Sequence, residues 1–323
     1  MIYLATRRGL YRWFEATGTL KFFGLAETPL FDVAVGGDGR VVALDAAGRI
    51  WITRNGGIDW HVAELSNQSH RPTAILAVPG TDTVLLGTSP PAVYRCHWGG
   101  GPWEAVVTLH DQPIAEGWYA PGGGSPAVRT LAVAPDDPEM LYADIHVGGV
   151  VRSTDAGRTW QRADEGLEQD VHEVCTSPAN PQGVYAATAE GFYFSPDHAA
   201  SWQRRNEGLD RHYCRAVAVH AEDPEIVLVS ASPTPPPGWA SGGKRFGLYR
   251  TEDGGASWEL VVHGLHPEAN DVIDSGCVAF SREAPGQVLC GYESGELFVS
   301  QDSGNMWQPA AQKLARIYRV VAV

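Results

Sequence analysis

The sequence predicts an all-β protein, and more specifically a single seven-bladed β-propeller made of four-stranded antiparallel blades. Two observations carry this prediction: a composition rich in turn-forming and aromatic residues, and a short pattern that recurs along the chain. The 323 residues include 37 Gly, 22 Pro and 11 Trp but only 3 Met. Such a composition is typical of many short strands joined by tight turns around an aromatic-rich core.

The recurring pattern is Ser/Thr-x-Asp-x-Gly-x-Ser/Thr-Trp, with copies roughly 40 to 60 residues apart. Its two best copies are STDAGRTW at 153–160 and TEDGGASW at 251–258. Weaker copies are SQDSGNMW at 300–307, SPDHAASW at 195–202, TRNGGIDW at 53–60 and CHWGGGPW at 96–103. A short Asp side chain can accept hydrogen bonds from its own turn, and Gly permits a positive φ. We therefore predict that the pattern stabilises the turns of hairpins. Its carboxylates are then structural and not catalytic acids: Asp155, Asp197, Asp253 and Asp302.

The segments around each copy repeat in one order. RTLAVAP (129–135) is followed by MLYADIH (140–146), GVVRST (149–154), the eight-residue pattern and a closing strand. This order predicts a four-stranded meander, the unit of a propeller blade. Six such blades fit between about residues 30 and 314.

The two ends of the chain supply the parts of one more blade. ARIYRVVAV (315–323) repeats the innermost-strand pattern, and residues 1–27 supply further strands without an innermost one. Joined, they predict a seventh blade that closes the ring and removes exposed sheet edges. We therefore treat 1–323 as one domain.

The eight-residue pattern resembles the Asp-box of BNR-repeat propellers, and the resemblance covers almost the whole chain. This superfamily includes sialidases and other glycoside hydrolases. Its seven-bladed members are similar to photosystem assembly factors, which bind protein segments through a basic patch on one face. A sialidase would use an arginine triad, which Arg129, Arg215 and Arg319 could imitate, but the usual Arg-Ile-Pro motif is absent. Candidate carboxylates for a glycosidase are Asp144, Asp170, Asp271, Asp274 and Glu293.

Charge and hydropathy exclude some classes of partner. The net charge of -14 argues against general nucleic-acid binding, which needs a dense Lys/Arg surface. The chain has no apolar run long enough for a signal peptide or a membrane helix. We therefore expect a cytoplasmic protein without a membrane partner. The five cysteines show no CxxC spacing, and we expect reduced thiols.

Two insertions point to the face opposite the eight-residue pattern. They span about 110–126 and 231–246, and each carries a Trp amid Gly and Pro, Trp118 and Trp239. Long irregular loops in compact domains often bind ligands, although they can also be tolerated surface. Tyr119 lies beside the first of these Trp residues.

The innermost strands converge on the axis at the same face. Aligning them by their shared ends gives one equivalent position per blade: Phe31, Ala74, Arg129, His172, Arg215, Gly276 and Arg319. Two explanations of the four basic residues stay open. Neighbouring acids such as Asp144, Asp170 and Glu173 could pair with them in a structural ion network. Alternatively, the arginine forks could recognise a carboxylate or phosphate.

Two Asp-x-His pairs, Asp144-x-His146 and Asp170-x-His172, fall on neighbouring blades, and His212 belongs to a third pair in the next blade. Alternate residues of a strand point to one side, so a pair could present two ligands to a transition metal. The carboxylate could equally serve only to orient the imidazole.

These observations predict a pocket for a small anionic or polar ligand, with metal-assisted, lyase or hydrolase chemistry as an open addition. A protein-binding scaffold and a glycoside hydrolase are the alternatives. The predicted ligand-binding residues are Arg129, His172, Arg215, Arg319, Trp118, Tyr119 and Trp239. If a reaction follows, the candidates for it are His172, Asp170, Tyr213 and Asp274.

Overall fold

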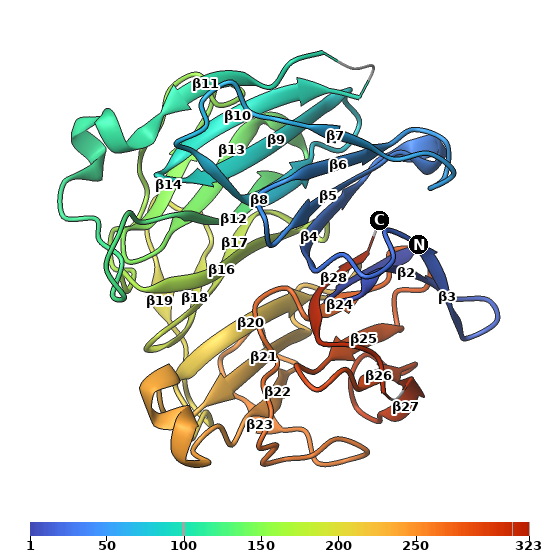
Figure 1. The fold of residues 1–323 in the computed structure, drawn as a ribbon. Coiled ribbons are helices and arrows are strands. Elements are labelled where there is room, and N and C mark those ends of the chain that lie inside the picture. The colour runs from blue at the N-terminus through green and yellow to red at the C-terminus, as the bar shows by residue number, and fades with distance from the viewer. Residues whose placement is uncertain (99–100, 312, 323) are drawn as a thin grey trace.

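The computed structural model describes residues 1–98, 101–311 and 313–322. Their strands form seven four-stranded sheets arranged in a ring (Figure 1), which confirms the predicted all-β seven-bladed propeller. Neighbouring strands within a sheet are antiparallel, as β1 and β2 are in the first blade. The pattern copy at 96–103 includes residues 99 and 100, which lie outside the described residues.

The two ends of the chain share one blade, as predicted. Its strand order is β28 (Ile317–Ala322), β1 (Ile2–Thr6), β2 (Gly9–Phe14) and β3 (Thr19–Gly24). Figure 1 shows the N- and C-termini side by side at this blade. Every residue of β1 is buried, because β28 covers the edge that the N-terminal strands would otherwise expose.

The other six blades each form from four consecutive strands. Their innermost strands are rich in Val and Ala, which pack well on a sheet that is covered on both faces. The first three of these blades are β4 (Leu30–Val35), β5 (Val41–Asp45), β6 (Ile50–Thr53) and β7 (His61–Ala63); β8 (Arg71–Ala77), β9 (Thr83–Ser89), β10 (Ala92–His97) and β11 (Glu104–Thr108); and β12 (Val128–Ala134), β13 (Asp137–Ile145), β14 (Gly149–Ser153) and β15 (Gln161–Arg162).

The last three blades complete the ring, and four short 3₁₀ turns lie in the described loops between strands. These blades are β16 (Val171–Ser177), β17 (Asn180–Thr188), β18 (Gly191–Ser195) and β19 (Gln203–Arg204); β20 (Tyr213–Val219), β21 (Val227–Ser232), β22 (Gly247–Thr251) and β23 (Glu259–Leu260); and β24 (Val278–Phe280), β25 (Val288–Gly291), β26 (Leu297–Ser300) and β27 (Gln308–Ala311). The 3₁₀ turns are η1 (Gly37–Gly39), η2 (Leu109–Asp111), η3 (Pro113–Ala115) and η4 (Pro236–Ser241).

Apolar clusters lie between neighbouring blades and hold them together. One of them joins Leu4 of β1 to Val278 of β24 and Val288 of β25, so it seals the ring at the closing blade. Trp307, which ends the last copy of the eight-residue pattern, is buried in the same cluster. None of the helices in the described residues is long and apolar enough to cross a membrane.

The eight-residue loops are closed by their own side chains. In the loop at 251–258, Asp253 Oδ1 accepts hydrogen bonds from Thr251 Oγ1 (2.6 Å) and from the Ser257 amide (2.8 Å). The Thr251 hydroxyl in turn accepts the amide of Gly255, whose φ is +89°. The loops at Asp155, Asp197 and Asp302 repeat this arrangement. These carboxylates are used within their turns, as predicted.

The same loops contact the turn between the first and second strands of their blades, or the start of the second strand. The Ala156 amide donates to the Glu139 carbonyl (2.9 Å), and the Gly254 amide donates to the Glu225 carbonyl (3.0 Å). The loops therefore lie at the ends of the innermost strands, on one face of the ring. The starts of the innermost strands form the opposite face.

We expect Asp253→Ala to lower the free energy of unfolding by about 1 kcal/mol at pH 7, the usual net contribution of such hydrogen bonds. Hydrogen bonds from Ser257 and Thr251 hold the pKa of Asp253 at about 2. A lowered pKa in the folded state stabilises the protein above the unfolded value of about 4, and this stabilisation is lost as the pH falls towards about 2. Urea unfolding should therefore separate the two proteins at pH 7 and much less at pH 2.5. Equal stability at pH 7 would contradict the role of Asp253.

Candidate functional site

A cavity of about 280 Å³ opens on the axis among the starts of the innermost strands, on the face opposite the eight-residue loops. Arg129 lies in β12, Arg215 in β20 and Arg319 in β28, so strands from three blades bring these side chains to one place. Of the seven positions aligned from the sequence, Phe31 and His172 also line the cavity. The remaining lining residues are Asp32, Thr73, Ala127, Val128, His146, Asp274, Ser275 and Tyr318.

Arg215 is paired with a carboxylate. Its Nε and Nη2 donate to Asp274 Oδ1 at 2.9 and 2.5 Å. Although burial opposes ionisation of Asp274, the Arg215 charge and its hydrogen bonds hold the pKa of Asp274 at about 2. Both Arg215 and Asp274 are therefore charged, and the net charge of the pair is zero.

Arg319 is paired with two carboxylates. Its Nε lies 3.3 Å from Asp32 Oδ1, and its Nη1 lies 3.8 Å from Glu173 Oε1. Burial raises the pKa of Glu173 to about 7 in spite of the Arg319 charge. Asp32 and Glu173 also accept backbone amides, those of Val33 and Ile75 for Asp32 and those of Val217 and Gly276 for Glu173. Arg319 thus belongs to a buried ion network.

Arg129 is the least compensated of the three arginines. Its Nη1 lies 3.5 Å from Asp170 Oδ1 and donates to the carbonyl of Val171 (3.1 Å). The same Asp170 oxygen lies 3.4 Å from Nε2 of His172, but that nitrogen carries no proton in the neutral ring, so it does not compete with Arg129 for the carboxylate. Burial and the Arg215 charge lower the pKa of Arg129. An anion at this end of the cavity would offset the Arg215 charge and stabilise the charged form of Arg129.

Two histidines stand beside Arg129. Burial and the Arg129 charge lower the pKa of His146 to about 4, and the imidazole makes no hydrogen bond to any residue that the structure describes. Burial and the Arg215 charge likewise lower the pKa of His172 to about 4. Nδ1 of His172 bonds to the Cys214 carbonyl (2.5 Å), which assigns its proton to Nδ1 and leaves Nε2 as an acceptor. Both rings are neutral at pH 7.

The predicted metal ligands are not brought together. Asp144 is fully buried and lies opposite Thr130, where the register between β12 and β13 shifts. Its Oδ1 accepts the amide of Thr130 (2.8 Å) and the Thr130 hydroxyl. His212 Nε2 lies 3.0 Å from the Leu209 carbonyl. Asp170 and His172 do meet. Within residues 1–98, 101–311 and 313–322, no group of three or more His, Cys, Asp or Glu side chains is placed to hold a metal ion.

The aromatic residues of the two insertions lie outside the cavity lining. Trp239 packs on Tyr213 (ring centroids 6.0 Å apart), and Tyr213 packs on His172 (4.6 Å), so the second insertion reaches the cavity through Tyr213. Trp118 packs against the apolar cluster between the blades that begin with β8 and β12, and Tyr119 is 56% exposed. In Figure 1 the coiled turns of both insertions, teal and orange, lie on the same side of the ring.

Sequence reasoning missed Asp32 as a member of the site. Its Oδ1 accepts the Val33 amide (2.8 Å) and its Oδ2 accepts the Ile75 amide (2.9 Å), so it ties β4 to β8 beside Arg319. The signal was an acidic residue inside the apolar strand LFDVAV, where an unpartnered carboxylate would be costly.

Comparison with known proteins supports the fold. A family model described as Sortilin, neurotensin receptor 3 (Sortilin-Vps10) matches residues 148–270. No curated protein matches the sequence. Among solved structures, the GH74 xyloglucanase from Xanthomonas campestris is 15% identical with a TM-score of 0.73. The match covers 97% of this chain and 52% of that one, so this chain spans about half of the xyloglucanase.

Smaller propellers are similar as well. YCF48 bound to D1 peptide is 17% identical with a TM-score of 0.61, and the match covers 87% of this chain and 82% of that one. YCF48 from Cyanidioschyzon merolae is 15% identical with a TM-score of 0.58, covering 87% and 84%. At these identities the likeness establishes the propeller fold alone.

Proposed function

We propose that this protein binds a small organic anion in the axial cavity, with Arg129 as the principal contact. The observation that carries the proposal is the uneven pairing of the three arginines. Arg215 has a carboxylate at 2.5 Å and Arg319 has two, at 3.3 and 3.8 Å, whereas Arg129 has only one among the described residues, at 3.5 Å. The pKa of Arg129 is accordingly lowered, while those of Arg215 and Arg319 are raised. His146 is neutral at pH 7, so no charged imidazole competes with Arg129 for a carboxylate or phosphate bound next to it. We also propose that the eight-residue loops are of the Asp-box type, on the basis of their Ser/Thr, Asp and Gly hydrogen bonds.

Binding is favoured over glycoside hydrolysis by the state of the carboxylates. A glycosidase needs one carboxylic acid and one carboxylate free to reach the substrate. The acids that line this cavity, Asp32 and Asp274, are both engaged by arginine and backbone amides, and Asp144 is buried away from its lining. The similarity to a xyloglucanase therefore carries less weight here than the arginine geometry does.

A protein segment is the second candidate ligand, because the similar YCF48 was solved bound to a peptide. An acidic peptide would use the same Arg129 contact. Measuring the affinity of a short Asp/Glu peptide and of free small anions therefore separates the two candidate ligands. A peptide that binds at least tenfold more tightly than citrate would favour a protein-binding function.

The direct test is calorimetric titration of the protein with malonate, citrate and inorganic phosphate, with xylose as the neutral comparison. We expect binding of at least one anion, weakened at least tenfold by Arg129→Met and unaffected by Arg158→Met, which removes an equal charge from an exposed loop on the other face. For a monocarboxylate such as acetate, affinity should fall as the pH rises from 5.5 to 8. Asp144 near Arg129 and Glu173 beside Arg319 have pKa values of about 6 and about 7, so both gain negative charge in this range, whereas both histidines stay neutral. Equal affinity of the Arg129→Met variant for every anion would refute the assignment.

A further inference from the structure

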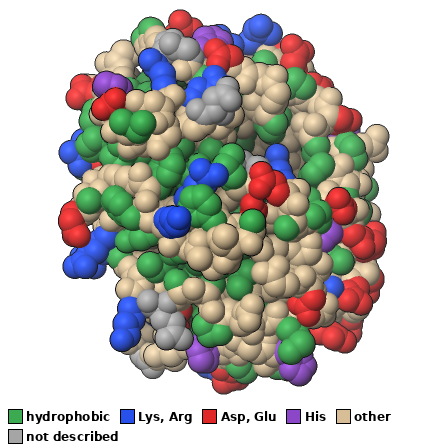
Figure 2. All heavy atoms as spheres, turned by 90° about the vertical axis from the view of Figure 1, so that its right-hand side faces the viewer, with side chains coloured by type: hydrophobic (Ala, Val, Ile, Leu, Met, Phe, Trp, Pro, Cys, Tyr) green, Lys and Arg blue, Asp and Glu red, His purple; other side chains and the backbone are tan. Residues whose placement is uncertain are grey.

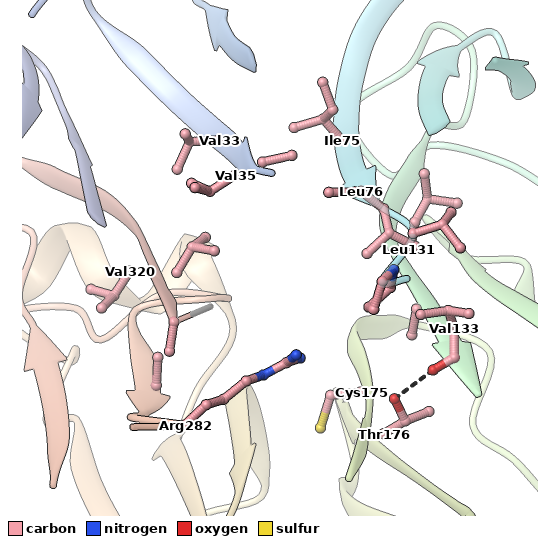
Figure 3. A pocket seen from close by; sticks show the side chains of 18 of the residues that line it. Val33, Val35, Ile75, Leu76, Leu131, Val133, Cys175, Thr176, Arg282 and Val320 are labelled. Carbon is pink, nitrogen blue, oxygen red and sulfur yellow. Dashed lines mark hydrogen bonds between the residues drawn. The ribbon is translucent and has the colours of Figure 1, made fainter. Parts of the chain in front are cut away.

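A second and larger cavity lies on the face of the eight-residue loops. Its volume is about 550 Å³, within the usual range of small-molecule sites. Figure 2 looks onto this face, where hydrophobic, basic and acidic side chains stand around the hollowed centre. The ends of the innermost strands form its walls, which are mainly apolar (Figure 3): Val33, Val35, Leu76, Leu131, Val133 and Val320.

The two cavities are separate sites on one axis. Arg319 lines both of them, and of its two partners Asp32 lines the smaller cavity and Glu173 the larger one. A ligand in the larger cavity therefore meets an ion network that is already paired, and it makes no contact with Arg129, which lines only the smaller one.

One cation in the larger cavity has no partner within the part of the chain that the structure describes. Arg282 follows β24 and extends into the open space between the apolar walls (Figure 3). Arg282 is exposed to the solvent of the cavity, and no carboxylate or other hydrogen-bonding group among the described residues contacts its guanidinium. The protein groups crowded around it lower its pKa. Its charged neighbours are satisfied: Arg40 pairs with Asp82 (3.2 Å), and Glu283 pairs with the amino terminus (3.4 Å).

An unpaired guanidinium within apolar walls specifies the chemistry of a ligand. A carboxylate would form a charge-assisted, two-point contact with the guanidinium. The rest of the ligand would lie against Val, Leu and Ala side chains, which form no hydrogen bonds. Burial of aliphatic surface against them would contribute favourably to the free energy of binding. A sugar or a dianion would leave polar groups unsatisfied against these walls.

We propose that this cavity binds an aliphatic monocarboxylate, with the carboxylate on Arg282 and the chain against Val33, Leu131 and Val133. The site is independent of the arginine cavity at the other end of the axis. Octanoate is a suitable probe, and hexanoate, 1-octanol and octylamine test the contributions of chain length and charge.

Calorimetric titration tests the proposal. Octanoate should bind roughly tenfold more tightly than hexanoate, as expected for two buried CH₂ groups. Arg282→Met should weaken octanoate binding at least tenfold, whereas Arg129→Met should leave it unchanged. Octylamine and 1-octanol should each bind at least tenfold more weakly than octanoate. Unchanged octanoate affinity in Arg282→Met, or equal affinity for 1-octanol, would overturn the proposal and leave an apolar cavity without anion recognition.

A second readout locates the ligand. Cys175 lies on the cavity wall (Figure 3) and is half-buried, while the other four cysteines are buried. Burial raises the pKa of Cys175, so its alkylation by N-ethylmaleimide should be slow and measurable by mass spectrometry at pH 8.5. Saturating octanoate should slow alkylation of Cys175 at least fivefold, and citrate should not. Octanoate that binds without protecting Cys175 lies elsewhere, and the assignment to this cavity would then be wrong.

Discussion

Replacing Arg319 with methionine is expected to lower the free energy of unfolding by about 3–5 kcal/mol, the usual cost of removing one partner from a buried ion pair. Asp32 and Glu173 are only 5% and 6% exposed, and Arg319 is their shared cation. Without it, two carboxylates at the centre of the ring lose their compensating charge. Because Arg319 lies on β28, the strand that closes the ring, the loss falls on the contact between the two ends of the chain.

Urea unfolding at two pH values checks this expectation. Burial already raises the pKa of Glu173, and loss of Arg319 raises it further, so folding of the variant should favour proton uptake. A raised carboxyl pKa means that stability falls as the pH rises from about 4.5 through about 7. The deficit of Arg319→Met should therefore be larger at pH 8 than at pH 5. Arg158→Met is the control, and a deficit below about 1 kcal/mol at pH 8 would show that the network contributes little.

Gly264→Ala should lower the free energy of unfolding by about 2–4 kcal/mol, from a positive φ and steric overlap together. Gly264 has a φ of +86°, and an added Cβ would overlap the carbonyl oxygen of Trp307 in the next blade. The Trp307 amide donates to the His263 carbonyl at this point (3.0 Å), so the backbone cannot move away without losing an inter-blade hydrogen bond.

Gly56→Ala separates the two causes. Gly56 also has a positive φ, +71°, but nothing lies within 4 Å of a Cβ built there. Its substitution should cost only about 1 kcal/mol, the conformational part alone. Thermal unfolding of both variants measures the difference, and equal losses at the two positions would contradict the steric explanation.

The eight-residue loops were predictable because their interactions are local. Asp253 bonds to Thr251 and Ser257 of its own turn, so the short pattern contains every group that the turn needs. The ring closure was predictable for a related reason: the terminal segments repeat the strands of a blade and lack what the other supplies. The contact of Gly264 with Trp307 escaped prediction, since it joins two blades across 43 residues of chain.

By itself the sequence determined the seven-bladed ring, the face on which the Asp-containing loops lie, and the gathering of Arg129, Arg215 and Arg319 near the axis. Only the tertiary structure decided which of these arginines is compensated. Asp274 reaches Arg215 from another blade at 2.5 Å, and Arg319 has two carboxylates, Asp32 at 3.3 Å and Glu173 at 3.8 Å, while Arg129 has Asp170 at 3.5 Å. Turn geometry follows from neighbours in the chain, whereas charge pairing depends on ångström-scale distances between strands that sequence spacing does not encode. The unpaired Arg282 in the larger cavity was hidden for the same reason.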